Sequence, residues 1–356
     1  GLMDIEAERP MRTDTVFRIM SMTKPVIALS ILMLVEEGKV RLTDPAAKFI
    51  PELQALSVVV PNTDGVFAAA PSGAVSAPPP LRTVPADRPI TIRDLLTHTS
   101  GLMSGGASSA YTAAVVVNPA ETLADVLPRL QGTTLDFQPG THWAYSAQFG
   151  FDVLARIVEV ASGMRVNEFV KQRIFDPLDM QDTFFYRAAA QPRMATLYQR
   201  VDGVLRAQPE PPFLNGAYFS GGGGLASTAE DYLKFALMLL NGGQLDGSRL
   251  VGRRTVELMA SVFAPDTLPG RNPGEGYGLG VRVVSDPAAR NTLVSQGTFG
   301  WSGAYNTHFF IDPKEKIVAI FMTQVANLEA RGEIRNDFET AVMQAVVDDT
   351  ALGSAH

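Results

Sequence analysis

The longest apolar stretch of the chain runs from Val26 to Val35 and is interrupted only by Ser30. A helix that is apolar on all sides is a buried helix. Gly38 suits the left-handed residue that follows a helix C-terminus. Pro25 fits only the first turn of a helix, where its missing N–H group costs nothing. The pattern therefore predicts a buried helix that begins within a few residues of Ser21.

Elsewhere the spacing of apolar residues predicts helices through the middle of the chain and strands nearer its ends. Further helices are expected at 91–97, 149–161, 166–174, 228–241 and 333–347, with Gly163 as the stop of the second. Strands are expected at 15–19, 292–296, 305–311 and 316–323, and a hairpin around Asp202-Gly203. Residues 57–89 are rich in Pro, Ala, Gly and Ser, which is typical of a long exposed loop.

Together these elements predict an α+β fold, an α/β sandwich in which helices flank an antiparallel sheet. Because strands lie near both ends of the chain, we expect one sheet built from both chain ends, with a mainly helical domain inserted between them. The α/β domain would comprise residues 1–55 and 205–356, and the helical domain residues 56–204. A length of 356 residues is compatible with two domains.

Composition excludes several classes of protein. The net charge is −7 and no block of Lys or Arg is present, so neither nucleic acid nor an anionic membrane is an expected partner. No apolar run approaches the roughly 18–20 residues of a membrane span. The chain has no cysteine, and its four histidines are not paired at ligand spacing, so we expect no metal and no cofactor. No signal-peptide pattern is visible, and the location stays open between bacterial cytoplasm and periplasm.

Ser21 and Lys24 form a Ser-x-x-Lys motif at the start of the predicted buried helix. Residues three apart share a helix face, so the hydroxyl and the amine can meet. The helix N-terminus adds free N–H groups and partial positive charge, which suit a serine that attacks a carbonyl group. A lysine in an apolar surround can accept a proton. The motif alone is common, and it needs support from other sites.

Tyr145 lies on a predicted loop just before a helix, where a side chain can project into a cleft. A tyrosine near cationic groups can act as a base, although a packed aromatic residue is the simpler interpretation. A rival nucleophile is Ser302, in a Gly-Trp-Ser-Gly-Ala sequence that partly matches a nucleophile elbow, with His308 or His98 as its base. The run Gly221–Gly224 lacks the Lys-Ser/Thr of a phosphate-binding loop, and it predicts a tight turn or a wall at which the backbone passes close to a ligand.

Three motifs in this order resemble those of the serine β-lactamase and penicillin-binding-protein superfamily. They are Ser21-x-x-Lys24, Tyr145-Ser146-x and Trp301-Ser302-Gly303, joined by phrases such as Asp94 to Leu102 and Gly222 to Leu225. The sequence is most similar to the β-lactamase-like carboxylesterases, often called family VIII esterases. The resemblance implies that Ser21 forms an acyl-enzyme while Lys24 and Tyr145 share the role of base. It also implies an oxyanion hole made by the backbone N–H groups of Ser21 and Ala304.

The sequence departs from the β-lactamase pattern at two positions. Ala147 stands where the second motif usually ends in asparagine, and Trp301 stands where the third begins with lysine. Losing an amide donor and a cation disfavours carboxylate-bearing β-lactams and peptides, whereas an aromatic wall favours neutral esters. Trp301, Ser302 and Gly303 are therefore the expected substrate-binding residues. Family members also usually carry a helix and two or more strands before the nucleophile, more chain than is present here.

We therefore expect a serine hydrolase that cleaves small carboxylic esters. A β-lactamase or D-alanyl-D-alanine peptidase and an acyltransferase using the same residues are alternatives, and a non-catalytic sensor acylated at Ser21 is an alternative of another class. A small-molecule ester is the expected partner. The sequence leaves open the oligomeric state, the physiological ester and which of Lys24 and Tyr145 takes the first proton.

Overall fold

The computed structural model describes residues 1–61, 81–110, 115, 117–118, 120–185, 192–209, 216–326 and 331–347. The described helices include α1 (Thr23–Glu36), α2 (Ile92–Leu96), α3 (Leu123–Val126), α4 (Phe149–Ser162), α5 (Val166–Val170), α6 (Ala229–Leu240), α7 (Arg253–Met259), α8 (Pro287–Arg290) and α9 (Arg331–Gln344). None of the described helices is long and apolar enough to cross a membrane.

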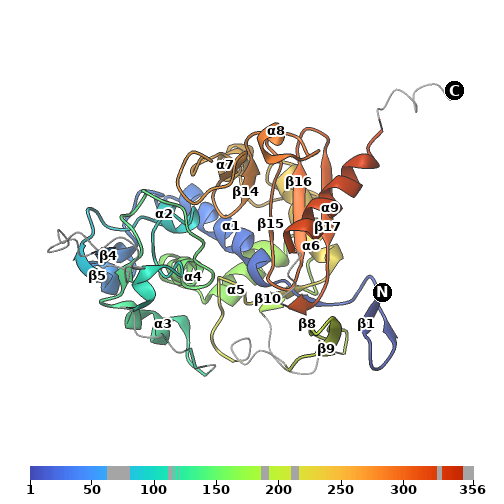
Figure 1. Ribbon diagram of the computed structural model, residues 1–356, viewed down its shortest axis with the longest axis horizontal. Coiled ribbons are helices and arrows are strands. Elements are labelled where there is room, and N and C mark those ends of the chain that lie inside the picture. The colour runs from blue at the N-terminus through green and yellow to red at the C-terminus, as the bar shows by residue number, and fades with distance from the viewer. Residues whose placement is uncertain are drawn as a thin grey trace, which may run out of the picture.

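Helix α1 lies at the centre of the molecule, between helices α2 to α4 and the strands of the large sheet (Figure 1). Every residue from Thr23 to Leu34 is buried, because the helix is apolar around its whole circumference and is covered on all sides. Gly38 adopts a positive φ of 69° just beyond its end. The predicted buried helix is confirmed, together with its start beside Ser21.

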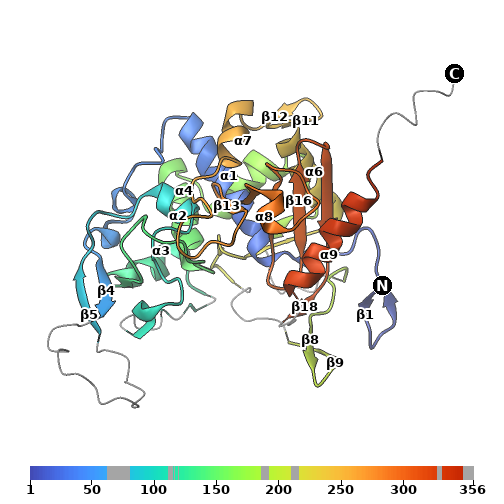
Figure 2. The same ribbon diagram turned by 45° about the horizontal axis from the view of Figure 1, so that its top comes forward.

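The largest described sheet is antiparallel and contains five strands in sequential order. They are β13 (Glu275–Tyr277), β14 (Arg282–Val284), β15 (Phe299–Ser302), β16 (His308–Asp312) and β17 (Ile317–Phe321). Side chains alternate across β16: Phe309 and Ile311 join the main core with α1 and α6, whereas Phe310 packs against Phe338 of α9. Helices therefore cover both faces of this sheet, as Figure 2 also shows for α6 and α9.

The origin of these strands differs from the sequence-based expectation in one respect. All five strands lie within 275–321, whereas the N-terminal strand β3 (Phe17–Arg18) pairs with β10 (Leu225–Ser227). Strand β10 also pairs with β7 (Phe184–Phe185), which completes a separate three-stranded sheet. The chain leaves β3 after two residues because the turn containing Ser21 follows at once. The N-terminal strand and the C-terminal strands thus belong to two separate sheets and not to one. Both sheets are antiparallel, as the predicted fold class requires.

Two further expectations about local structure were wrong. Residues 292–296 are not a strand, because the chain turns at Gly297, whose φ is +88°, and pairing begins only at Phe299. The predicted loop at 57–89 contains two paired strands, β4 (Ser57–Pro61) and β5 (Leu81–Pro85), and β4 also pairs with β6 (Thr134–Leu135). Val58 and Val59 are buried, so β4 packs on the core despite its surroundings in the sequence. Residues 62–80 lie outside the described ranges.

The remaining short strands form two antiparallel pairs and one mixed three-stranded sheet. They are β1 (Leu2–Asp4) with β2 (Arg9–Pro10), β11 (Gln244–Leu245) with β12 (Ser248–Arg249), and β18 (Val325–Ala326) beside β8 (Tyr198–Val201) and β9 (Val204–Ala207). The predicted hairpin at Asp202-Gly203 is confirmed between β8 and β9, with both turn residues at positive φ. One apolar core extends from α1 to both α4 and the large sheet. The division into two domains stays a prediction.

Candidate active site

Ser21 lies in a short 3-10 turn, Met20–Met22, directly before α1. Met20 has a φ of +48°, a conformation that a residue with a side chain adopts only when its surroundings hold it there. The surroundings do so: the Ile19 N–H donates to Leu225 at 3.1 Å, and the Tyr232 hydroxyl donates to the Met22 carbonyl at 2.8 Å. The turn therefore places the Ser21 hydroxyl rigidly at the N-terminus of the central helix.

Lys24 is fully buried one turn further along, and its amine is directed at Ser21. Its Nζ atom is 2.6 Å from the Ala147 carbonyl, 2.7 Å from the Gly222 carbonyl and 3.2 Å from Ser21 Oγ. The two carbonyl groups can only accept, so they take two of the lysine's hydrogens. The third tetrahedral position of Nζ is thereby aimed at Ser21 Oγ, either as a donor when the amine is charged or as an acceptor when it is neutral.

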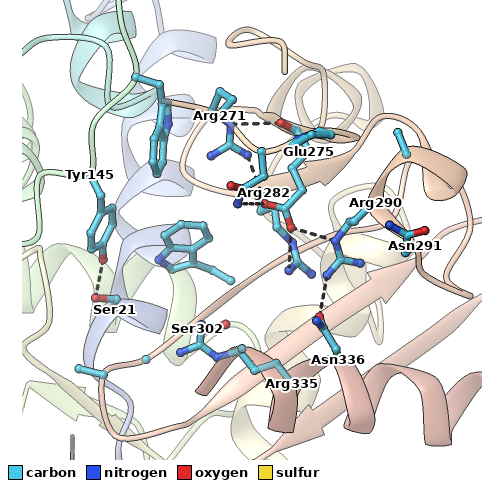
Figure 3. A pocket seen from close by; sticks show the side chains of 18 residues that line it. Ser21, Tyr145, Arg271, Glu275, Arg282, Arg290, Asn291, Ser302, Arg335 and Asn336 are labelled. Atoms are coloured by element: carbon cyan, nitrogen blue, oxygen red, sulfur yellow. Dashed lines mark hydrogen bonds and ion pairs between the residues drawn. The ribbon is translucent and has the colours of Figure 1, made fainter. Parts of the chain in front are cut away.

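Tyr145 also contacts Ser21, and its hydroxyl donates to Ser21 Oγ at 2.7 Å (Figure 3). The loop that carries it is tied to His98: the Ala144 N–H donates to the His98 carbonyl, and the Ser146 N–H donates to His98 Nδ1. The His98 ring also contacts the Tyr145 ring edge-on, at 4.7 Å between centroids. Burial and the positive charges of Lys24 and Arg271 hold the pKa of His98 well below its usual value. A neutral His98 therefore positions Tyr145.

The third motif forms the end of β15 and faces the other two motifs. Trp301 lies 5.5 Å from Tyr145 between ring centroids. A Cβ atom on Gly303 would lie 2.4 Å from the Ile19 carbonyl, so only glycine permits this strand to approach the Ser21 turn so closely. Ser21 and Ala304 both line the resulting cavity. Within the described ranges, no acceptor is recorded for the backbone N–H of either residue.

These groups open into a cavity of about 780 Å³. Aromatic and charged side chains both line it. Figure 3 shows Tyr145 beside Ser21, and Arg282, Arg290 and Arg335 further from Ser21. Two of the arginines share carboxylate partners, since Arg290 binds both Glu275 and Glu339 and Arg282 binds Glu339 at 2.5 Å. These ion pairs join α9 to the sheet. The described residues contain no group of three acidic or histidine side chains arranged to hold a metal ion.

The rival nucleophile, Ser302, is placed differently from Ser21. Its Oγ lies 2.8 Å from His308 Nδ1, so one of the two candidate bases is in contact with it. The other, His98, lies in the aromatic group beneath Tyr145 and not at Ser302. Ser302 ends a strand, and within the part of the chain that the structure describes neither a helix N-terminus nor a lysine contacts its hydroxyl. The structure therefore brings Ser21, Lys24 and Tyr145 together as expected and leaves Ser302 in a second arrangement.

Asp152 is an important residue that the sequence reasoning missed. It is fully buried on α4 and accepts from the Tyr218 hydroxyl at 2.7 Å, the Ser220 hydroxyl at 2.7 Å and the Gly222 N–H at 3.0 Å. It thereby fixes the segment whose Gly222 carbonyl binds Lys24. The glycine run forms the predicted tight turn, in which the Gly224 N–H donates to the Ser220 carbonyl at 2.9 Å. A Cβ atom on Gly222 would lie 2.8 Å from the Gln148 backbone. An acidic residue on the apolar face of a predicted helix is the signal that could have revealed it.

Replacing Asp152 by alanine should destabilise the protein by about 2 kcal/mol or more, because buried donors are left without an acceptor. Burial raises the pKa of Asp152, so part of the loss is offset by no longer desolvating the carboxyl group. Chemical denaturation measures the effect. The matched control is Asp176→Ala, which removes an exposed ion pair with Lys171 and should change the free energy of unfolding by less than about 1 kcal/mol. Equal stability of the two variants would contradict the structural role of Asp152.

The model of the family described as Beta-lactamase matches residues 1–344, and the chain belongs to this family. Protein Rv1367c of Mycobacterium tuberculosis is 38% identical over 345 residues, which cover 91% of this chain and 81% of that protein. Esterase EstB of Burkholderia gladioli is 32% identical over 353 residues, covering 92% of this chain and 81% of that protein.

The fold of this chain is also similar to that of a solved structure. EstCE1, described as a hydrolase with promiscuous acyltransferase activity, superposes with a TM-score of 0.75 at 24% sequence identity, over 96% of this chain and 88% of its own. The expected β-lactamase-like fold is therefore confirmed. The family and the esterase relative support a serine hydrolase, and the ester substrate and the roles of single residues belong to the proposal below.

Proposed function

We propose that this chain is a serine carboxylesterase that cleaves small, neutral esters through an acyl-enzyme on Ser21. The observation that carries the proposal is the position of Ser21 Oγ, 2.7 Å from the Tyr145 hydroxyl and 3.2 Å from Lys24 Nζ. A serine needs an adjacent base to attack a carbonyl group, and both groups are within reach of its proton. The esterase relative points to the same chemistry.

In the proposed reaction Ser21 Oγ attacks the ester carbonyl and gives its proton to the Lys24–Tyr145 pair. The backbone N–H groups of Ser21 and Ala304 stabilise the negative oxygen of the tetrahedral intermediate. As the intermediate collapses, Tyr145 delivers a proton to the departing alcohol oxygen, and the acyl group stays on Ser21. Water then attacks the acyl-enzyme, the same pair accepts its proton, and the carboxylic acid leaves as the proton returns to Ser21.

The preference for neutral esters rests on the inner wall of the cavity. Trp301 occupies the place at which the β-lactamase pattern has a lysine, and its ring lies against Tyr145 and Tyr277. Ala147 offers only its carbonyl group, which is already bound to Lys24. An aromatic wall favours an apolar acyl or alcohol group, because burying apolar surface is the main gain at such a site.

Mass spectrometry after reaction with a fluorophosphonate tests the nucleophile, and turnover of a short p-nitrophenyl ester against a chromogenic cephalosporin tests the substrate class. The proposal expects an adduct on Ser21 and faster turnover of the ester. Faster turnover of the cephalosporin would make the chain a β-lactamase. A burst of one equivalent of product without further turnover would identify an acylated sensor.

Acyl transfer to an alcohol is a second candidate, favoured by the size of the cavity. A volume of about 780 Å³ leaves room for an acceptor beside the acyl group. EstCE1, which shares the fold, is described as having such an activity in addition to hydrolysis. Product analysis with an added alcohol distinguishes the two, since transfer gives a new ester and hydrolysis gives only the acid.

A further inference from the structure

Ser302, His308 and Glu339 form a hydrogen-bonded chain that the proposed reaction does not use. Ser302 and His308 are cross-strand partners on β15 and β16, and Ser302 Oγ lies 2.8 Å from His308 Nδ1. On the far side of the ring, His308 Nε2 lies 3.1 Å from Glu339 Oε1 of α9. His308 and Glu339 are almost completely buried, whereas Ser302 lines the cavity that contains Ser21.

The charges around Glu339 determine which ring nitrogen of His308 carries hydrogen. Arg282 donates to Oε1 at 2.5 Å and Arg290 donates to Oε2 at 2.9 Å. Burial alone would raise the pKa of Glu339, but the bond to His308 and these guanidinium groups hold it well below its usual value, so Glu339 is ionised. A carboxylate only accepts, and His308 must therefore donate to it from Nε2.

His308 itself is neutral. Burial lowers its pKa, the bond to Glu339 opposes that effect, and the charges of Arg282 and Arg335 lower the pKa further. Glu339 already has two cationic partners, so a third positive charge on His308 would lack a counter-charge. A neutral imidazole with hydrogen on Nε2 has a lone pair on Nδ1, and this nitrogen can only accept.

We propose that the His308–Glu339 pair locks the Ser302 hydroxyl so that it presents only acceptor lone pairs to the substrate. The single O–H of Ser302 is given to His308 Nδ1, and no second side-chain bond to Ser302 Oγ is recorded among the described residues. Ser302 is then a specificity-determining residue that selects esters carrying an amide N–H or a hydroxyl group, and His308 is its positioning residue. The inference rests on the proposed esterase function for its kinetic consequence.

Ser302 would therefore accept a hydrogen bond from the substrate. A hydroxyl that binds a substrate carboxylate has the opposite role, because it donates. A carboxylate placed against Ser302 would meet lone pairs, which repel it. A substrate N–H would instead complete the hydrogen-bond chain from substrate to Ser302, His308 and Glu339. Neighbouring hydrogen bonds of this kind polarise one another and favour that orientation. In Figure 3, Ser302 lies between the Ser21–Tyr145 pair and the side chains of α9.

The orientation of the Ser302–His308 hydrogen bond is tested without any substrate. The measurement is 15N NMR of protein labelled with 15N at the histidine rings. The His308 signals are assigned by their loss in His308→Asn and confirmed by their displacement in Ser302→Ala, which alters only a partly exposed side chain. The expected result is a hydrogen on Nε2 and an unprotonated Nδ1 at neutral pH. A hydrogen on Nδ1, or on both nitrogens, would overturn the proposal.

The specificity is tested with matched p-nitrophenyl esters of acetylaminoalkanoic acids of increasing spacer length. Each is compared with the ketone in which CH2 replaces the amide N–H, so that the pair differs only in the donor. For the spacer that reaches Ser302, kcat/KM should favour the N–H member by about fivefold, the value of one net hydrogen bond. Ser302→Ala should remove this preference, and Ser302→Thr should retain it.

The outcomes separate the two proposals. Hydrolysis of both members with a ratio unchanged by Ser302→Ala would refute the role of Ser302 and leave the esterase intact. Failure to hydrolyse any ester, with no fluorophosphonate adduct on Ser21, would refute the esterase. In that case the NMR result still decides whether Ser302 is locked as an acceptor.

Discussion

Replacing Ser21 by alanine should reduce ester turnover by about 10⁴-fold or more, the loss typical of removing a catalytic nucleophile. The side chain is small and partly exposed at the cavity wall, and its loss leaves the main core untouched. Without Oγ no acyl-enzyme can form, although substrate can still bind in the cavity that Trp301 and Tyr145 line. The measurement is the rate of p-nitrophenyl ester hydrolysis, together with the mass of the fluorophosphonate-treated protein.

The control for this change is Ser261→Ala, an exposed serine that donates to the Glu257 carbonyl. It should retain full turnover and full labelling. If Ser21→Ala kept its activity and the adduct mapped to Ser302, the nucleophile would be Ser302 with His308 as base. The hydrogen bond between Ser302 and His308 is present in the structure. The residue that carries the adduct therefore has to be identified by peptide mapping, because the mass of the adduct alone does not distinguish Ser21 from Ser302.

The contact between Ser21 and Lys24 could be predicted from sequence because the two residues are neighbours on one helix turn. Ser21 and Lys24 are three residues apart, and the apolar run that follows fixes the helix that holds them. Tyr145 and Trp301 lie far along the chain and could be placed only through the order of motifs shared with a known family. The structure brings these residues together, within hydrogen-bond or ring-contact distance of one another.

The surrounding residues could not be predicted, because their roles come from pairings between distant parts of the chain. Asp152 binds Gly222 across 70 residues, and His308 meets Glu339 across 31. In sequence Asp152 is an isolated polar residue on an apolar helix, whereas Glu339 is one of several polar residues of α9. Neither residue has a spacing that reveals its partner. The sheet was mispredicted for a related reason: strand pairing is a long-range property, and β3 found its partner in β10.

The Lys24–Tyr145 pair should behave as one catalytic unit. Lys24→Met and Tyr145→Phe are each expected to lower kcat by about 10³-fold, because either change removes a group that contacts Ser21 Oγ. Members of one unit fail together, so the double variant should be little slower than the slower single variant. If the two residues acted independently, their losses would multiply to about 10⁶-fold. Stopped-flow acylation rates for the four proteins distinguish these cases.

Each variant has a matched control elsewhere in the chain. Lys171→Met removes an exposed amine, and Tyr198→Phe removes a hydroxyl on β8 that binds Glu6. Neither should alter the acylation rate. Lys24→Met also leaves the Ala147 and Gly222 carbonyls without their donor, so its folding is checked by thermal unfolding. A folded Tyr145→Phe protein with the acylation rate of the unchanged chain would exclude Tyr145 from proton transfer and leave Lys24 as the sole base.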